Sequence, residues 1–188
     1  MIHTEIYRKE MDFMNYATIK PVDIANGPGV RVSLFVSGCT HHCRECFNAE
    51  AWDFDFGNPF TEETIETLLN ALDHDYIEGL TLLGGEPLEP SNQEGLLPFI
   101  KEVRKRFPEK TIWCFSGYEF EKDILGWMLP SLETSRQLIP LLDVLVDGQF
   151  VAEKKNLSLK FRGSENQRIL DVKRSLEENR AVWVGEFC

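Results

Sequence analysis

Three cysteines lie close together on one short segment of the chain. Cys39, Cys43 and Cys46 have the spacing C-x3-C-x2-C, and they directly follow the apolar, β-branched run from Arg31 to Val36. Three thiolates on one loop can bind three irons of a [4Fe–4S] cluster and leave the fourth iron open, whereas electron-carrier clusters use four cysteines. The spacing therefore predicts a cluster with one free coordination position, which favours a catalytic role.

The alternative for the same cysteines is a structural zinc site. Cys3His is a common zinc ligand set, and either His41 or His42 lies close enough along the chain to complete it. Zinc sites usually draw their ligands from two separated pairs, and the sequence has no second C-x2-C pair. We therefore favour the iron–sulfur cluster. We expect the two histidines to be loop residues, with His41 able to form a hydrogen bond near the cluster.

Three further apolar runs each end in a glycine-containing polar segment. These segments are GGEP at residues 84–87, SGY at 116–118 and DGQ at 147–149. Gly84 and Gly85 let the backbone approach a ligand closely, and the carboxylate of Glu86 can accept hydrogen bonds from a cationic amine. Ser116 and Asp147 are secondary candidates for the same pocket, although turn formation explains their segments about as well.

The elements that must position these segments alternate between strands and helices. The expected strands cover residues 31–36, 79–83, 111–115 and 143–146, and the expected helices cover 61–73 and 92–107. Helical segments interrupted at Pro130 and Pro140 precede the last of these strands. The tail from Arg168 onward predicts a strand, a helix and a strand, from the runs RILDV, KRSLEEN and AVWV.

This alternation predicts an α/β fold with a parallel sheet and right-handed crossovers. A complete eightfold barrel takes about 250 residues, and this chain has 188. We therefore predict a single domain built as a partial, open βα barrel, with a doubly wound open sheet as the alternative. In both folds chemistry gathers at the C-terminal ends of the parallel strands, and all four polar segments follow expected strands.

Composition narrows the classes of partner. The formal net charge is −11, and such an acidic surface disfavours direct binding to nucleic acid or to anionic membranes. No apolar run reaches the roughly 18–20 residues of a membrane-spanning helix, and residues 1–12 lack the apolar stretch of a secretory signal. Three of the five cysteines are clustered, which indicates metal or redox chemistry in a reducing compartment. We therefore expect a cytoplasmic protein.

The cysteine spacing together with GGEP resembles the radical S-adenosylmethionine (SAM) enzymes. The resemblance implies that Cys39, Cys43 and Cys46 are the cluster ligands and the catalytic residues. It also implies that SAM binds the free iron through its amino and carboxylate groups, and that the GGEP segment, Gly84, Gly85 and Glu86, holds the amino group. One electron from the reduced cluster then breaks a C–S bond of SAM and releases a 5′-deoxyadenosyl radical. Ser116 and Asp147 are further candidates for binding SAM.

Within that superfamily the chain resembles one family closely, the activating proteins of anaerobic (class III) ribonucleoside-triphosphate reductase. The resemblance runs from Met14 to Asp171 through DIANGPGVR, LFVSGCTHHCRECFN, LLGGEPL, FSGYEF, DVLVDGQF and FRGSENQR. It departs at Glu45, where the family usually has glycine. Residues 1–13 precede the family's usual start, so we expect an N-terminal extension there and a radical SAM domain over residues 14–188.

Residues of the DIANGPGVR motif are candidates for a supporting role. Asn26, Gly27 and Arg31 are expected to organise the cluster loop or a docking face, and an ordinary surface charge is the alternative for Arg31.

The family resemblance implies a protein substrate. The expected activity is the generation of a glycyl radical on the large subunit of the anaerobic reductase, with an unidentified one-electron reductant as a second partner. An activase for another glycyl radical enzyme, of the pyruvate formate-lyase type, is the first alternative. A non-catalytic iron–sulfur or zinc binding module is the second, and a small-molecule radical SAM enzyme with a closed pocket is the third. The RGSENQR segment and the short chain favour the reductase.

Overall fold

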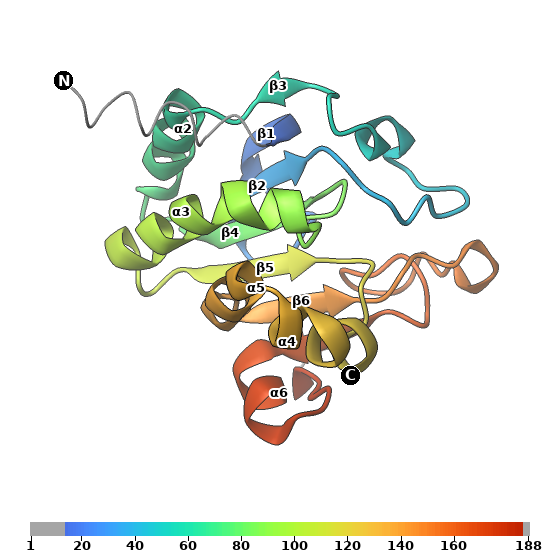
Figure 1. Ribbon diagram of the computed structural model, residues 1–188. Helices are drawn as coiled ribbons and strands as arrows, with labels where there is room; N and C mark the ends of the chain where they lie inside the picture. The colour runs from blue at the N-terminus through green and yellow to red at the C-terminus, as the bar shows by residue number, and fades with distance from the viewer. Residues whose placement is uncertain (1–13, 186–188) are drawn as a thin grey trace.

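The computed structural model describes residues 14–185, which form one seven-stranded sheet with helices packed against it (Figure 1). The strand order is β3-β1-β2-β4-β5-β6-β7. The expected extension at residues 1–13 and the last cysteine, Cys188, lie outside the described residues. No helix within residues 14–185 is long and apolar enough to cross a membrane.

The four central strands are the ones that the apolar runs predict. They are β2 (Val30–Val36), β4 (Ile77–Gly84), β5 (Thr111–Phe115) and β6 (Val144–Asp147), and each is parallel to its neighbour. The prediction of a parallel sheet is therefore confirmed for the centre of the sheet.

The outer strands run antiparallel to their neighbours, so the prediction of a wholly parallel sheet is wrong at both edges. These strands are β1 (Asn15–Asp23), β3 (Asn58–Pro59) and β7 (Arg168–Asp171). A parallel neighbour needs a crossover, usually through a helix, whereas an antiparallel neighbour needs only a loop. The chain from β1 to β2 and from β6 to β7 contains no crossover helix, which explains why β1 and β7 run antiparallel to these neighbours.

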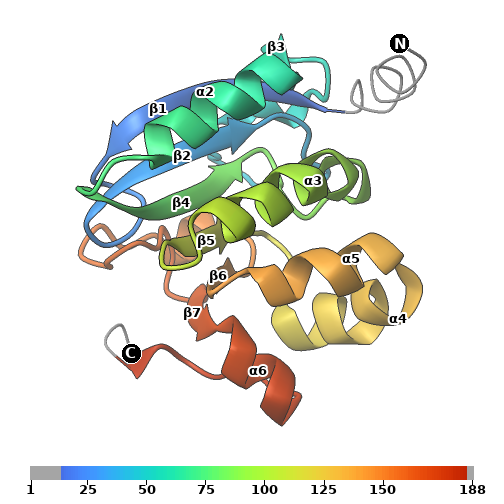
Figure 2. The same cartoon turned by 90° about the vertical axis from the view of Figure 1, so that its left-hand side faces the viewer.

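The helices follow the predicted order along the chain. They are α2 (Glu62–Leu72), α3 (Pro90–Arg106), α4 (Leu129–Ser131), α5 (Glu133–Leu138) and α6 (Val172–Glu178), with a π-helix, η2 (Phe120–Met128), and three short 3-10 turns, η1 (Ala49–Trp52), η3 (Ile139–Leu141) and η4 (Ala152–Lys154). Figure 2 shows α3, α4 and α5 together on one side of the strands. Thr61 caps α2 as its sequence indicates, because its hydroxyl accepts a hydrogen bond from the backbone N–H of Thr64 at 3.3 Å.

The two faces of the sheet have different coverings because successive strand residues point to opposite sides. Leu80 and Leu82 of β4 belong to the main core with residues of α2, α3 and α5. Trp113 of β5 belongs instead to a small cluster with Val146 and Ile169, against which Phe161 of the loop between β6 and β7 packs. Loops therefore cover this second face where helices cover the first.

Arg31 lies buried on the loop-covered face, so the interpretation of this residue as a surface charge is wrong. Its guanidinium donates to the Thr81 hydroxyl at 2.7 Å, to the Leu80 carbonyl at 2.8 Å and to the Thr111 carbonyl at 2.9 Å. Burial lowers its pKa to about 10, which leaves it charged at neutral pH. The Thr81 hydroxyl in turn donates to the Asn26 carbonyl at 2.8 Å. Arg31 therefore ties the loop between β1 and β2 to three strands.

Candidate functional site

The C-terminal ends of the four parallel strands surround one cavity of about 490 Å³, a size typical of small-molecule sites. The arrowheads of β2, β5 and β6 point to the same side of the molecule in Figure 1, where the loops after β2 and β6 lie. Residues of the four strand-end segments and of the first hairpin line this cavity. Those within the motifs of the sequence analysis include Asn26, Cys39, Cys43, Cys46, Gly84, Gly85, Glu86, Ser116 and Gly148. Residues more than a hundred positions apart thus meet in one place.

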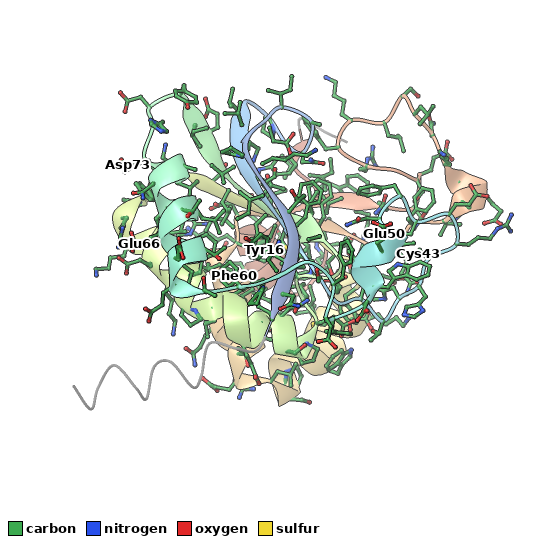
Figure 3. The ribbon with its side chains drawn as sticks, turned by 90° about the horizontal axis from the view of Figure 1, so that it is seen from above. Tyr16, Cys43, Glu50, Phe60, Glu66 and Asp73 are labelled. Atoms are coloured by element: carbon green, nitrogen blue, oxygen red, sulfur yellow. The ribbon has the colours of Figure 1, made fainter. Side chains whose placement is uncertain are left out.

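The loop that carries the cysteines is held to its neighbours at its start. The backbone N–H of Gly38 donates to the Ala51 carbonyl at 2.9 Å, and that of Cys39 donates to the Trp52 carbonyl at 3.1 Å. Cys39 is buried, and Cys43 and Cys46 are half-buried. Figure 3 shows Cys43 close to Glu50 of η1, on the opposite side of the view from Glu66 of α2 and from Asp73, which directly follows α2.

The N-terminal end of α3 binds the same loop through two buried polar side chains. The Asn92 amide donates to the Ser37 carbonyl and to the Glu86 carbonyl, each at 2.9 Å. The Glu89 carboxylate accepts hydrogen bonds from the backbone N–H of Thr40 at 2.8 Å and from its hydroxyl at 2.5 Å. These two residues, which the sequence analysis did not single out, fix the backbone on both sides of Cys39. The sequence feature that could have identified them is their position shortly after GGEP, at the start of a helix.

The three thiols fit a cluster that is bound through sulfur. All three line the cavity, and cysteine thiolates are the usual ligands of iron–sulfur clusters. Burial raises the pKa of the Cys39 thiol to about 12 and also raises the pKa of Cys43, so metal binding at neutral pH must release protons. Within residues 14–185, no group of three or more His, Cys, Asp or Glu side chains is placed to hold a single metal ion.

The two glycines of GGEP are required by the close approach of β4 to the cysteine loop. Gly84 has a φ of +110°, and a Cβ atom there would lie 2.7 Å from the Val36 carbonyl oxygen. A Cβ atom on Gly85 would lie 2.5 Å from the Gly38 carbonyl oxygen. Contacts this short exclude any side chain. In their place, the backbone N–H groups of Gly85 and Glu86 donate to the Val36 and Gly38 carbonyls at 2.7 and 2.8 Å.

Glu86 accepts four hydrogen bonds from three parts of the chain. One carboxylate oxygen accepts from the Leu88 backbone N–H and the Ser116 hydroxyl, each at 2.8 Å. The other accepts from the Gly117 backbone N–H at 2.6 Å and interacts with His41 Nε2 at 3.0 Å. A carboxylate offers about four lone-pair sites, and Glu86 is 1% exposed. Donors from the protein itself therefore use its full acceptor capacity.

His41 lies on the cysteine loop and faces the segments that follow β4, β5 and β6. Besides Glu86, its Nδ1 is 2.9 Å from the Gln149 side-chain nitrogen, and its ring packs edge-on against Tyr118 with centroids 4.5 Å apart. Burial disfavours the charged imidazole, but the hydrogen bond and the negative charge of Glu86 outweigh it, so the pKa of His41 is raised above 6.5. The hydrogen bond expected for this residue is present.

Ser116 and Asp147 occupy different environments. Ser116 lines the cavity and donates to Glu86. Asp147 is fully buried and is not among the lining residues; it binds the Arg168 guanidinium at 2.9 and 2.5 Å and accepts from the Phe120 backbone N–H at 2.8 Å. The structure thus brings Ser116 to the cavity, whereas Asp147 anchors β7 and η2 outside the lining.

The loop between β6 and β7 forms another wall of the cavity and contacts the cysteine loop, where Arg44 donates to Glu153 at 3.0 Å. Phe150, Lys155, Leu157, Phe161, Arg162 and Gln167 line it from this loop. The Gln167 amide donates to the Gly148 carbonyl at 3.0 Å, and the Asn166 amide donates to the Gln149 carbonyl at 2.8 Å. The RGSENQR segment therefore shapes the cavity through hydrogen bonds to the end of β6.

Comparison with known proteins gives two consistent results. Residues 25–170 match the family described as the 4Fe-4S single cluster domain. The anaerobic ribonucleoside-triphosphate reductase-activating protein of Pasteurella multocida is 45% identical over 161 residues, which cover 83% of this chain and 96% of the relative. The proteins of the same name from Enterobacteria phage T4 and Escherichia coli K12 are 44% and 41% identical, over 83% and 82% of this chain and 93% and 96% of their own lengths.

Proposed function

Because the chain belongs to the family of the anaerobic ribonucleoside-triphosphate reductase-activating proteins, we propose that it generates the glycyl radical of that reductase by radical SAM chemistry. Membership makes it an activating enzyme that carries an iron–sulfur cluster. The observation that carries the proposal is the single cavity at which the cysteine loop meets GGEP and the ends of β5 and β6. The four parallel strands around it then correspond to a partial radical SAM barrel within one domain.

The proposal assigns roles to the residues of the cavity. Cys39, Cys43 and Cys46 hold the [4Fe–4S] cluster. Gly84, Gly85 and Glu86 form the edge of β4 that holds SAM. The two glycines bring this edge against the cluster loop, and the hydrogen bond from Ser116 fixes the Glu86 carboxylate within it. Bound by these cysteines and reduced, the cluster would supply the one electron that cleaves SAM to methionine and a 5′-deoxyadenosyl radical. Asp147 supports the site indirectly, because it holds Arg168 of β7 and the backbone of Phe120 in η2 next to the end of β6.

Two features of the cavity suit a protein substrate. The large apolar side chains of Phe47 and Leu157 line it, yet they are 84% and 91% exposed. Exposed apolar groups beside a site mark surfaces that bind macromolecules, and a closed small-molecule pocket would bury them.

We propose the large subunit of the reductase as the substrate and an unidentified one-electron reductant as the second partner. Clustered thiols are typical of proteins in a reducing compartment, which supports a cytoplasmic location.

The first part of the test is SAM cleavage by the protein alone. The purified protein is reconstituted anaerobically with iron and sulfide, reduced and incubated with SAM, and 5′-deoxyadenosine is measured. We expect product from the unsubstituted protein and from Cys114→Ala, whose thiol is buried in β5, and none from Cys43→Ala. A protein with a full cluster that cleaves no SAM would contradict the proposal and would leave a non-catalytic cluster module.

The second part of the test is the choice of partner. The loaded protein is incubated with SAM and either the large anaerobic reductase subunit or pyruvate formate-lyase, and each mixture is examined by electron paramagnetic resonance. We expect a glycyl doublet with the reductase only. A doublet with pyruvate formate-lyase only would support the other activase class.

A further inference from the structure

His41 contacts each of the other three strand-end segments. Its Nε2 faces Glu86 after β4 at 3.0 Å, its ring packs against Tyr118 after β5, and its Nδ1 faces Gln149 after β6 at 2.9 Å. It lies on the cysteine loop itself, between Cys39 and Cys43. Among the described residues that line the cavity, it therefore links the cluster loop directly to the rest of the site.

The polarity of these contacts is determined by their partners. The ionised carboxylate of Glu86 can only accept, so Nε2 of His41 carries a hydrogen and donates it. The amide of Gln149 can donate to Nδ1 when the imidazole is neutral, or accept from it after rotating when the imidazole is charged. Nε2 therefore donates to Glu86 whether the imidazole is neutral or charged.

The backbone at Gly117 lies so close to the His41 ring that no side chain fits at this position. A Cβ atom on Gly117 would lie 2.4 Å from Cδ2 of His41 and 2.6 Å from Nε2. The same Gly117 donates its backbone N–H to Glu86 at 2.6 Å. The glycine of SGY thus allows both the backbone and the imidazole to reach one carboxylate oxygen.

We propose that His41 is a positioning residue that sets the distance and orientation between the cluster loop and the SAM-binding edge of the cavity. This inference rests on the proposed function. Glu86 is the fixed point, because the Leu88 and Gly117 backbone groups and the Ser116 hydroxyl hold its other three acceptor sites. The fourth site ties the cysteine loop to that point through His41. SAM must meet the open iron and the end of β4 at once, so a loop held loosely there costs affinity for SAM.

The neighbouring His42 provides a matched control on the same loop. His42 is exposed and stacks on Trp52 with ring centroids 4.7 Å apart. Its ring has the same size as that of His41, and the residue lies between the same two cysteines. A phenylalanine keeps an aromatic ring at either position, and at position 41 it also removes the two side-chain hydrogen bonds.

The test compares His41→Phe, His41→Gln and His42→Phe with the unsubstituted protein. Each is reconstituted, and four quantities are measured: iron and sulfide content, the thermal unfolding midpoint, the KM for SAM, and the change that SAM produces in the electron paramagnetic resonance signal of the reduced cluster. We expect His41→Phe to keep its iron content but to lose most of the SAM-induced change, and to raise the KM for SAM about tenfold, as for a lost hydrogen bond to a charged group. His41→Gln, whose amide can donate at the same reach, restores most of both, and His42→Phe behaves like the unsubstituted protein.

Three outcomes would overturn the inference. The first is a parental KM and spectral change in His41→Phe, and the second is tighter SAM binding in that variant, which would make His41 a competitor of SAM. The third is a His41→Gln variant as defective as His41→Phe, because the donated hydrogen bond would then not be the cause. Failure of the proposed function is recognised separately, since the unsubstituted protein with a full cluster would then show no response to SAM.

Discussion

Glu45 adopts a left-handed backbone conformation directly before the third cysteine, with a φ of +59°. A residue with a side chain is strained there by roughly 1–2 kcal/mol, whereas glycine is not. The side chain gains little in return, because it lies on the exposed surface and its ion pair with Arg44 spans 3.7 Å. The geometry thus gives a physical reason for the glycine that the family usually has before this cysteine.

Replacing Glu45 with glycine should therefore stabilise the metal-free protein. We expect Glu45→Gly to raise the free energy of unfolding by about 0.5–1 kcal/mol, after allowing for the greater freedom of glycine in the unfolded chain. The measurement is urea unfolding followed by circular dichroism. Glu50→Gly is the matched control, because Glu50 lies in the short helix η1, where glycine should lower stability. A Glu45→Gly protein no more stable than its parent would show that this residue is unstrained.

The buried pair of Asp147 and Arg168 should contribute more to stability than the surface pairs. Asp147 is 1% exposed and Arg168 is 26% exposed, so Asp147→Asn leaves a half-buried cation with a weaker partner. We expect a loss of about 2–3 kcal/mol in the free energy of unfolding, below the 3–5 kcal/mol of a fully buried pair. Glu133→Gln, which breaks an exposed pair with Arg136 at 2.7 Å, should cost less than about 1 kcal/mol. Equal losses in the two variants would contradict this ranking.

At the scale of elements, the central strands and main helices could be predicted because their signals are local. Apolar runs of four to six residues, each followed by a glycine-containing segment, predicted β2, β4, β5 and β6, and helical periodicity predicted α2 and α3. β1 was missed because it is largely half-exposed, contains Pro21 and has no continuous apolar run. The direction of β7 depends on how the chain returns to the sheet, which no local pattern encodes.

The C-terminal elements are joined to η2 by an acidic side chain whose effect depends on pH. Burial alone raises the pKa of Glu121, but hydrogen bonds from Arg168 and from the Ala181 backbone N–H outweigh it, and the pKa falls below 4.5. A carboxylate with a lowered pKa in the folded state stabilises the fold above its ordinary pKa. That contribution is lost as the pH falls through the folded-state value.

Glu121→Gln should therefore destabilise the protein at pH 7 and progressively less below about pH 4.5. Because the side chain is 45% exposed, we expect an effect of no more than about 1 kcal/mol at pH 7. Urea unfolding across this pH range measures it, with Glu177→Gln on α6 as a control whose effect should stay within about 0.5 kcal/mol. A difference that grows as the pH falls would contradict the assigned role.

At the scale of the whole molecule, the site is an assembly of distant segments held by a few buried polar contacts. The sequence could place the four polar segments at strand ends, and the parallel centre of the sheet brought them together. It could not show that Glu86 is saturated by internal donors or that His41 reaches Gln149. Apart from the hydrogen bond from Leu88, these contacts join residues 30 to 108 positions apart, and they depend on the packing of loops rather than on any local pattern.

Loading the cluster should stabilise the folded protein as a whole. Its ligands lie on a loop that is hydrogen-bonded to α3 and to the end of β4, so binding favours the folded state over the unfolded one. We expect anaerobic reconstitution to raise the thermal unfolding midpoint by about 5–10 °C, measured by calorimetry. Cys114→Ala should keep this increase and Cys43→Ala should lose most of it. An increase unaffected by Cys43→Ala would mean that the metal binds elsewhere.

The most direct measurement of the central claim is the glycyl radical formed on the reductase per molecule of SAM cleaved. The loaded, reduced protein is mixed with SAM and the large reductase subunit, spins are counted by electron paramagnetic resonance, and 5′-deoxyadenosine is quantified in the same sample. The account predicts a glycyl doublet that rises together with 5′-deoxyadenosine and is absent with Cys43→Ala. Cleavage of SAM with no radical on the reductase, from a protein whose cluster is complete, would contradict it.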